Sequence, residues 1–276
     1  MSAFCFFLCI FAVDFLKRTF VIMKKFIAGL FALVSLVSVV SCGSAEGGFT
    51  EERFVDNIFT VNKHTVTPEY SDTSYMVTNM DSYALKTGDR ARMILRYYYD
   101  AYSGKMPEWS IYSIDEVIPT RPLLSADAVD TTAYSTPITA LVYYEFMDRF
   151  VSPVWIWKNR QNLNVSYNGI KERTEFAMIV RGISEDVDAV GNSKRYCLDL
   201  ELRAKSHLNT GVKTTQLLTF DLANVGDFLT VEQKRLVAGV DSLHTKIYLK
   251  RLERVEDVET VRDIYIMGGS FANPLK

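Results

Sequence analysis

The 276-residue sequence predicts an all-β protein. Segments in which apolar and polar residues alternate with a period of two begin near Phe54 and continue to the C-terminus. These segments do not alternate with long helical stretches, which argues against an α/β fold. Hydrophobic residues make up 48% of the chain and charged residues 23%, so most of the chain can bury a core.

The alternating segments predict eleven strands in order along the chain. Their ranges are 54–62, 75–80, 90–99, 110–118, 138–147, 163–167, 175–183, 195–205, 215–221, 245–252 and 261–267. One short helix is predicted over 230–238, because Thr230 and Gln233 have the spacing of a capping box. A turn that separates two apolar runs predicts a positive φ at Gly88 and hydrogen bonds from local amides to Asp89.

The first 41 residues resemble a bacterial secretory signal. Two lysines follow Met23 and precede an uncharged apolar run over 26–40. This run is shorter than the roughly 20 residues that a membrane-spanning helix needs. We therefore expect residues 1–41 to be a signal peptide. If Met23 is the true initiator, residues 1–22 are an upstream extension, whereas a start at Met1 gives an unusually long signal.

The apolar run ends in small residues before Cys42, an order that resembles the lipobox of bacterial lipoproteins. In the lipobox pattern the cysteine thiol becomes a diacylglyceryl thioether and the freed amine takes a third acyl chain. Each buried methylene contributes about 0.8 kcal/mol, so two or three chains give durable anchoring. Cys42 is the predicted lipid-attachment residue, and 42–48 form a flexible tether. The alternative is a plain transmembrane anchor in which Cys42 has no role.

The charge balance argues against nucleic-acid binding. Without residues 1–41 the chain keeps 27 basic and 32 acidic residues, a net charge of −5, whereas a phosphate backbone demands surplus positive charge. Cys197 is then the single remaining thiol, so no intramolecular disulfide is predicted. Neither a histidine nor a helix start is near it in sequence, and we interpret it as an ordinary strand cysteine.

Two prolines and a polar run interrupt the strands over 119–132. This interruption predicts a small barrel-sized domain over 49–122, a linker over 123–134 and a sandwich-sized domain over 135–276.

Several loose motifs resemble the NigD-like lipoproteins. They are the lipobox, the segment 81–99 around Gly88-Asp89-Arg90, the strand end at 114–120, and Val154-Trp155-Ile156-Trp157 leading to 163–167. The resemblance covers essentially the whole mature chain and implies an N-terminal OB-like barrel followed by a β-sandwich. It implies no catalytic residue, and Cys42 alone corresponds to a functional position. The polar segment 158–162 departs from the glycine-rich connection of the family.

The sequence predicts a non-catalytic envelope lipoprotein that acts as a binding or assembly module for another envelope or secreted component. Motifs such as G-x-S-x-G, H-E-x-x-H and C-x-x-C are absent from the sequence. Neither a cofactor nor a metal is predicted. The segment 185–192 faintly resembles a calcium loop, but it lacks the carboxylate spacing of an EF-hand. We expect a protein-like contact surface or an open sheet edge, and attachment to the outer membrane on a face that the sequence does not choose.

The alternative is a surface glycan-binding lipoprotein that uses exposed aromatic residues. Trp155 and Trp157 are two residues apart, so a strand places both indoles on one face, where they could stack on a sugar ring. The same two indoles could instead fill the core of a sandwich. Their exposure distinguishes the two interpretations.

Overall fold

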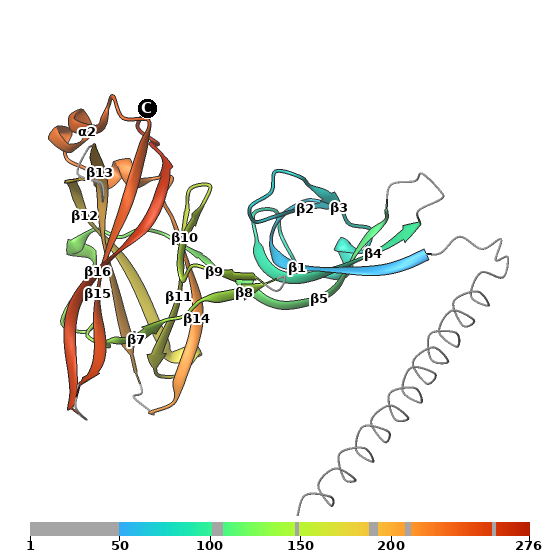
Figure 1. The fold of residues 1–276 in the computed structure, drawn as a ribbon, viewed down its shortest axis with the longest axis horizontal. Helices are drawn as coiled ribbons and strands as arrows, with labels where there is room; N and C mark the ends of the chain where they lie inside the picture. The colour runs from blue at the N-terminus through green and yellow to red at the C-terminus, as the bar shows by residue number, and fades with distance from the viewer. Residues whose placement is uncertain (1–49, 101–106, 147–148, 188–192, 208–210, 256–257) are drawn as a thin grey trace, which may run out of the picture. The chain divides into compact units, whose positions relative to one another are not determined.

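The computed structural model describes residues 50–100, 107–146, 149–187, 193–207, 211–255 and 258–276. Residues 51–99 and 106–276 belong to one compact unit. It contains a small antiparallel sheet and a large mixed sheet (Figure 1), which confirms the all-β class. Cys42, the predicted signal peptide and the tether lie outside the described residues. None of the described helices is long and apolar enough to cross a membrane.

The small sheet has five strands in the order β3-β2-β1-β4-β5. An isolated parallel bridge between Val77 and Trp109 brings its two edges together. Phe59, Met93 and Leu95 are fully buried between the faces of this curved sheet. The strands are β1 (Thr50–Asn62), β2 (Thr65–Pro68), β3 (Tyr75–Met76), β4 (Arg90–Asp100) and β5 (Trp109–Ile118).

The turn before β4 has the geometry that the sequence predicts. Gly88 has a φ of 95°, and the amide of Lys86 donates a hydrogen bond of 2.7 Å to Asp89 Oδ2. A Cβ atom makes this left-handed backbone conformation unfavourable, so a glycine is the residue best suited to this position. Both parts of the prediction for this turn are confirmed.

The large sheet has nine strands. Seven follow the order β12-β13-β15-β7-β11-β14-β6, while β10 pairs with β11 and β16 pairs with β15. A separate hairpin joins β8 (Tyr144–Phe146) to β9 (Arg149–Val151). The nine strands are β6 (Thr120–Arg121), β7 (Ile138–Leu141), β10 (Val154–Trp157), β11 (Arg160–Asn168), β12 (Thr174–Val187), β13 (Lys194–Ser206), β14 (Lys213–Asp221), β15 (Ser242–Val255) and β16 (Val258–Ala272).

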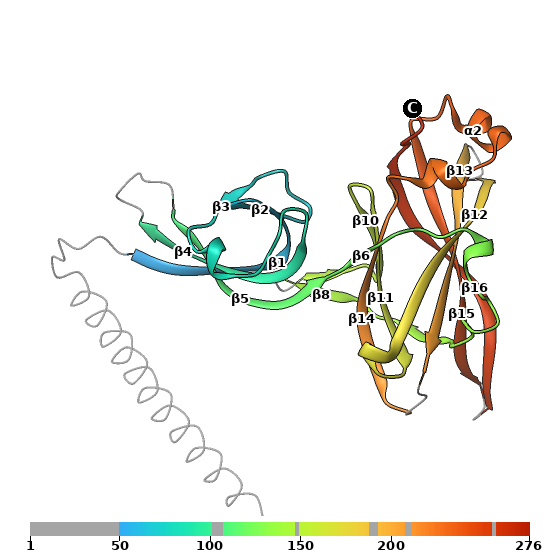
Figure 2. The same ribbon diagram turned by 180° about the vertical axis from the view of Figure 1, so that it is seen from behind.

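The large sheet curls around one core. Figures 1 and 2 show β12, β13, β15 and β16 on one side, and β10, β11 and β14 on the other. A single pair, Arg251 with Ile138, joins β15 to β7 and so connects the two groups. Leu163 and Leu218 from one group and Leu200 and Ile247 from the other are buried in the same cluster. The apolar faces that period-two alternation creates therefore meet in one interior.

Helix α2 (Val231–Val237) is the one α-helix among the described residues. The Thr230 side chain accepts a hydrogen bond of 3.2 Å from the Gln233 amide, and Gln233 Oε1 accepts one of 3.0 Å from the Thr230 amide. The predicted capping box is confirmed.

Two of the predicted strands differ from the structure. The stretch 138–147 is divided between β7 and β8, because β8 pairs with β9 in a local hairpin instead of extending β7. The stretch 75–80 has only two strand residues and then begins a 3-10 helix at Met80. In the segment 123–134, Leu124 forms a parallel bridge with Ile179, and Val129 is buried against β12.

Candidate binding surface

The hairpin of β15 and β16 forms one side of the large sheet in Figure 1. The two strands pair along their whole length, from Ser242 opposite Ala272 to Val255 opposite Val258. In the part of the chain that the structure describes, no other strand pairs with β16. One edge of β16 is therefore open over the first part of the strand, whereas near Gly269 the strand lies against Ile156 of β10.

Exposed apolar side chains gather on this hairpin. Val258, Val261 and Tyr265 are 60%, 53% and 57% exposed. Tyr248 lies directly opposite Tyr265 in the register, and the two ring centroids are 6.0 Å apart. The ammonium of Lys246 lies 4.3 Å from the centroid of Tyr265 and 5.8 Å from that of Tyr248. We call Lys246, Tyr248, Val261 and Tyr265 the tyrosine face.

Charged residues of the neighbouring strands border the tyrosine face. The guanidinium of Arg181 lies 5.1 Å from the centroid of Tyr248 and donates a hydrogen bond of 2.8 Å to Glu201 Oε2. Arg203 forms an ion pair with the other oxygen of the same carboxylate. Aromatic residues and arginine surrounded by a polar rim are the composition of protein–protein interfaces.

Cys197 lies next to this surface, opposite His244 in the parallel register of β13 and β15. Burial raises the pKa of the Cys197 thiol and lowers the pKa of the His244 imidazole. A nucleophilic cysteine needs the opposite change, a lowered thiol pKa. The arrangement therefore agrees with the interpretation of Cys197 as an ordinary strand cysteine.

The two tryptophans of β10 differ in exposure. Trp155 is 5% exposed, and its indole N–H donates a hydrogen bond of 3.1 Å to Glu69 Oε2. Trp157 is partly buried against the same apolar cluster, and its ring lies 5.2 Å from that of Tyr70. Both indoles lie on one face, but that face is mostly covered. Trp155 is not available for stacking on a ligand.

The partner of Trp155 belongs to a buried charged cluster. Glu69 and Arg90 are 2% and 1% exposed and form an ion pair. Arg90 also donates hydrogen bonds to Asn162 Oδ1 at 3.1 Å and to Thr219 Oγ1 at 2.6 Å. Burial and the nearby charge of Arg160 lower the pKa of Arg90. The ion pair and the hydrogen bonds of Arg90 connect the small sheet to the large one, while Arg90 Nε is buried without a hydrogen-bond partner among the described residues. A buried pair with these contacts indicates a structural role.

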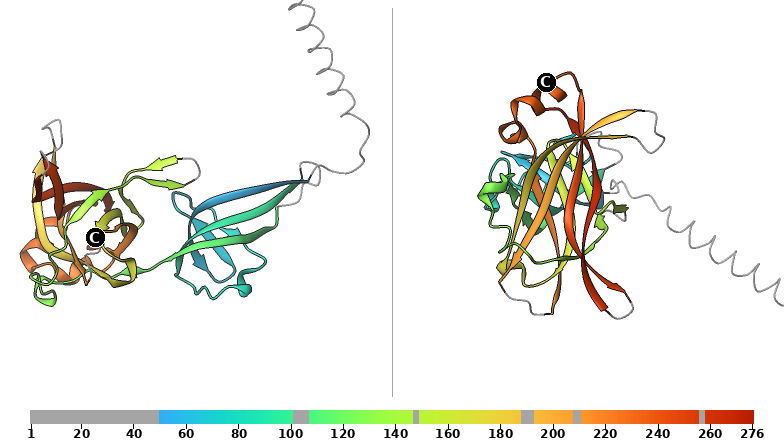
Figure 3. Two further views of the ribbon diagram at one scale, coloured as in Figure 1. Left: turned by 90° about the horizontal axis from the view of Figure 1, so that it is seen from below. Right: turned by 90° about the vertical axis from the view of Figure 1, so that its left-hand side faces the viewer.

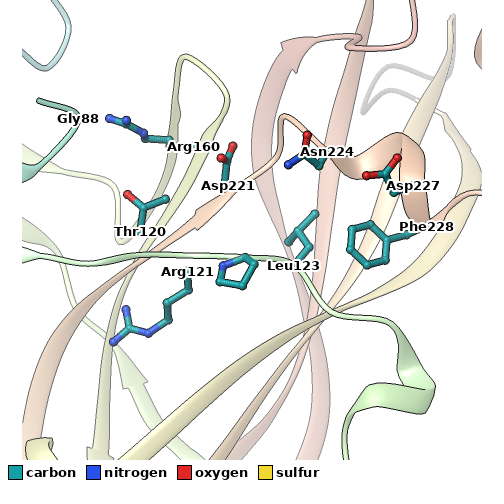
Figure 4. A pocket seen from close by; sticks show the side chains of 10 residues that line it. Gly88, Thr120, Arg121, Leu123, Arg160, Asp221, Asn224, Asp227 and Phe228 are labelled. Atoms are coloured by element: carbon teal, nitrogen blue, oxygen red, sulfur yellow. The ribbon is translucent and has the colours of Figure 1, made fainter.

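A cavity of about 480 Å³ lies near the start of the large sheet (Figure 4). Its walls carry two arginines and two aspartates, and in Figure 4 the side chains of Arg121 and Asp227 point away from each other. Burial lowers the pKa of Arg121 and of Arg160. The charged groups of Arg121 and Asp227 thus do not converge on one position in this cavity. The other lining residues are Gly88, Thr120, Pro122, Leu123, Asp221, Asn224 and Phe228.

The sequence did not single out the tyrosine face. Alternation along 246–250 places Lys246 and Tyr248 on one face of their strand, and alternation along 263–267 assigns Tyr265 to one face of another strand. Alternation does not show that these two strands are neighbours, which follows only from their pairing in the structure. Within the described ranges, no three His, Cys, Asp or Glu side chains gather in a way that could hold a metal ion.

No protein-family model matches the chain. No curated protein matches it either. Among solved structures, the chain matches a putative lipoprotein from Bacteroides fragilis at 13% identity with a TM-score of 0.51, over 80% of this chain and 98% of the other. An uncharacterized protein from Parabacteroides merdae matches at 10% identity and a TM-score of 0.49, over 80% and 98%. A NigD-like immunity protein from Bacteroides caccae matches at 13% identity and a TM-score of 0.44, over 80% and 94%.

The Bacteroides fragilis match places the chain in the same fold class as that β-rich protein. At 13% identity, the Bacteroides fragilis match shows a shared fold and nothing more specific. The resemblance to NigD-like proteins that the sequence motifs predicted is found again among the structural matches. None of the three matched proteins is named for a catalytic activity.

Proposed function

We propose that this chain is a non-catalytic lipoprotein of the cell envelope, anchored through Cys42, that binds a protein partner with the tyrosine face and the open edge of β16. The partner is another envelope component or a secreted protein. Membrane attachment through Cys42 is supported by the lipobox-like sequence and by the lipoprotein name of the Bacteroides fragilis protein that shares the fold. The proposed location is the outer membrane.

The pair of Tyr265, which is exposed, and Tyr248, which is partly buried, is the observation that supports a protein partner over a glycan. Sugar rings stack on free aromatic faces, but here Lys246 lies over both tyrosines and Arg181 lies over Tyr248. The cations offer hydrogen-bond donors and the rings offer apolar area, a combination enriched at protein interfaces. The adjacent open edge of β16 adds unpaired backbone groups, to which an extended segment can bind as a further strand.

We infer further that the small sheet is the OB-like barrel of the resemblance and that the large sheet is an open β-sandwich. The parallel bridge between Val77 and Trp109 supports the first inference, because it joins the two edges of a five-stranded sheet. The single connection between Arg251 and Ile138 supports the second, because the two groups of strands otherwise face each other across a common core.

The test of anchoring replaces the cysteine. Wild-type protein expressed in its native host should incorporate labelled palmitate and sediment with membranes, whereas Cys42→Ala should do neither. Cys197→Ala is the matched control and should leave the label unchanged. Equal labelling of wild type and Cys42→Ala would contradict the proposed anchor.

The test of the binding surface is site-specific photo-crosslinking in living cells. A photoreactive phenylalanine analogue at Tyr265 should give one discrete crosslinked protein. The same analogue at Val231, which is 64% exposed on α2, should not. Val261→Ser combined with Tyr265→Ser should lower the yield of that product at least tenfold, measured with the analogue at Tyr248. Equal crosslinking at Val231 and Tyr265, or an unchanged yield in the double variant, would contradict the proposed surface.

A further inference from the structure

One end of the small sheet carries an unusual number of aromatic residues. The register of β4 with β5 places Tyr97 opposite Trp109, and hydrogen bonds from Arg96 and Tyr98 to Glu52 place the start of β1 beside the end of β4. Figures 1 and 3 show these strand ends together. The aromatic residues at this end are Phe54, Tyr75, Tyr97, Tyr98, Tyr99, Trp109 and Tyr112. We call this set the aromatic end.

Four of these side chains are exposed to solvent. Phe54, Tyr98, Tyr99 and Tyr112 are 50%, 47%, 43% and 57% exposed. The rings of Phe54 and Tyr112 are in edge contact, with centroids 5.1 Å apart. Tyr98 and Tyr99 are consecutive on β4 and so point to opposite faces, whereas Arg96 lies beside both Tyr98 and Tyr112. Phe54, Tyr98 and Tyr112 thus form one exposed aromatic group, which marks an interaction site rather than a chance distribution of single residues.

Two arginines lie among the rings and are balanced by acidic residues. Arg96 lies 5.6 Å from the centroid of Tyr98 and 5.9 Å from that of Tyr112. Arg96 forms an ion pair with Glu52, and Arg53 forms one with Glu51 at 2.7 Å. The charges of these two pairs cancel, which suits a zwitterionic lipid headgroup layer better than a strongly charged ligand. Tyrosine, tryptophan and arginine are the residues that place apolar surface and polar groups at a membrane interface.

The length of chain before the small sheet places this end close to the predicted anchor. Seven residues separate Cys42 from Thr50, the first residue of β1. Even fully extended they reach about 25 Å. The proposal of a lipidated Cys42 therefore constrains the start of β1 to lie within that distance of the bilayer surface, and Phe54 follows four residues later on the same strand.

We propose that the aromatic end docks on the phospholipid headgroup layer of the membrane that holds the Cys42 lipid. This inference rests on the proposed anchoring and adds a second contact to it. The rings of Phe54, Tyr98 and Tyr112 enter the interfacial layer, and Arg96, which lies beside two of these rings, reaches a lipid phosphate. Docking fixes the small sheet against the bilayer and leaves the tyrosine face on the large sheet for the protein partner.

The test uses the acylated full chain in phosphatidylcholine vesicles that contain a headgroup-attached nitroxide quencher. Trp109 reports on the aromatic end, because its ring lies 4.2 Å from those of Tyr75 and Tyr97. We expect the nitroxide to quench part of the tryptophan fluorescence. Trp109→Phe should reduce the quenched fraction at least twofold, whereas Trp157→Phe, in the large sheet, removes unquenched fluorescence and should raise it.

A surface variant extends the test without touching the core. Phe54→Ser combined with Tyr98→Ser and Tyr112→Ser should reduce quenching of Trp109 at least twofold while the protein still floats with the vesicles. Because Arg53 and Arg96 are already paired with Glu51 and Glu52, 0.5 M salt should change the quenching little. Flotation without any quenching of Trp109, or equal quenching in the triple variant, would overturn docking and leave the anchor intact. Failure to float would instead contradict the anchor. If Trp109 is not quenched in pure lipid vesicles, but the aromatic end crosslinks to a protein in native membranes, then the aromatic end binds a protein partner rather than lipid.

Discussion

The small and the large sheet are stabilised in different ways. Among the described residues, the main core of the large sheet contains 22 buried apolar side chains, whereas that of the small sheet contains nine. The small sheet adds a fully buried ion pair between Glu69 and Arg90, whose hydrogen bonds extend to Asn162 and Thr219 in the large sheet. A small domain buries too little apolar surface to be very stable alone. The comparison indicates that the small sheet depends on its polar contacts with the large one.

The two sheets also present aromatic residues differently. The large sheet exposes Tyr265 on one face, beside the partly buried Tyr248, in the middle of long paired strands. The small sheet exposes them at one end, next to the predicted tether. A face bordered by an open edge suits an extended protein segment, whereas a cluster at one end suits a planar surface such as a bilayer. The difference separates the two proposed roles in space.

The largest expected effect comes from the buried pair. Arg90→Met should lower the free energy of unfolding by about 3–5 kcal/mol, because it leaves the carboxylate of Glu69 buried without its partner. Chemical denaturation measures the loss. Arg90→Met combined with Glu69→Leu should recover most of it. Arg92→Met is the matched control, since its pair with Asp56 is partly exposed and should contribute about 1 kcal/mol or less. A loss at Arg90 no larger than that at Arg92 would show that the buried pair does not stabilise the small sheet.

This pair also marks a limit of prediction from sequence. Glu69 lies outside every predicted strand, and Arg90 begins a strand that alternates, so nothing local indicates that both are buried. Their burial depends on Trp155 and Thr219, which lie far along the chain. The same contact explains why Trp155 is covered rather than exposed. Contacts between residues far apart in the sequence decide whether these side chains are buried. The alternation of apolar and polar residues along one strand carries no information on such contacts.

Local features, in contrast, were predictable. The capping box at Thr230 follows from side-chain chemistry over four residues, and the turn at Gly88 follows from the steric freedom of glycine. Strands with one buried face were found because their period is two. Short strands such as β2 and β6 were missed, since two to four residues give too little alternation to recognise.

The second prediction compares two glycines with positive φ, one in each sheet. Gly182 in β12 has a φ of 135°, and a Cβ there would lie 2.3 Å from Gln233 Nε2. Gly182→Ala should therefore strain the backbone, displace the capping side chain of α2 and cost about 1–3 kcal/mol. Thermal unfolding measures the change. Gln233→Ala separates the contributions, because it removes the cap alone and should cost about 1 kcal/mol. Equal losses of stability in Gly182→Ala and Gln233→Ala would show that backbone strain at Gly182 does not contribute to the loss.

The third prediction concerns the matching glycine of the small sheet. Gly88 has a φ of 95°, but a Cβ there would meet no atom within 4 Å. Gly88→Ala should cost about 1 kcal/mol from backbone strain alone. Gly88→Asn should cost less, since asparagine tolerates this conformation better. Thermal unfolding of both variants tests this order, and a loss at Gly88 larger than at Gly182 would contradict the assignment of the clash.

The smallest expected effect has opposite signs at two aspartates on the outer face of the large sheet. Burial raises the pKa of Asp199, although a hydrogen bond from Ser184 opposes the shift. The folded state thus binds this proton more tightly than the unfolded state, and stability falls as the pH rises through the raised pKa. Asp199→Asn should therefore raise the melting temperature at pH 7 relative to wild type, with the gain disappearing below the usual aspartate range.

Hydrogen bonds from the Val187 amide and Arg195 instead lower the pKa of Asp186. Asp186→Asn should lower the melting temperature at pH 7, and that loss should disappear as the pH falls through the lowered pKa. Shifts of the same sign in the two variants would show that burial does not govern Asp199, and that the surface beside the tyrosine face is more open to water than the structure shows.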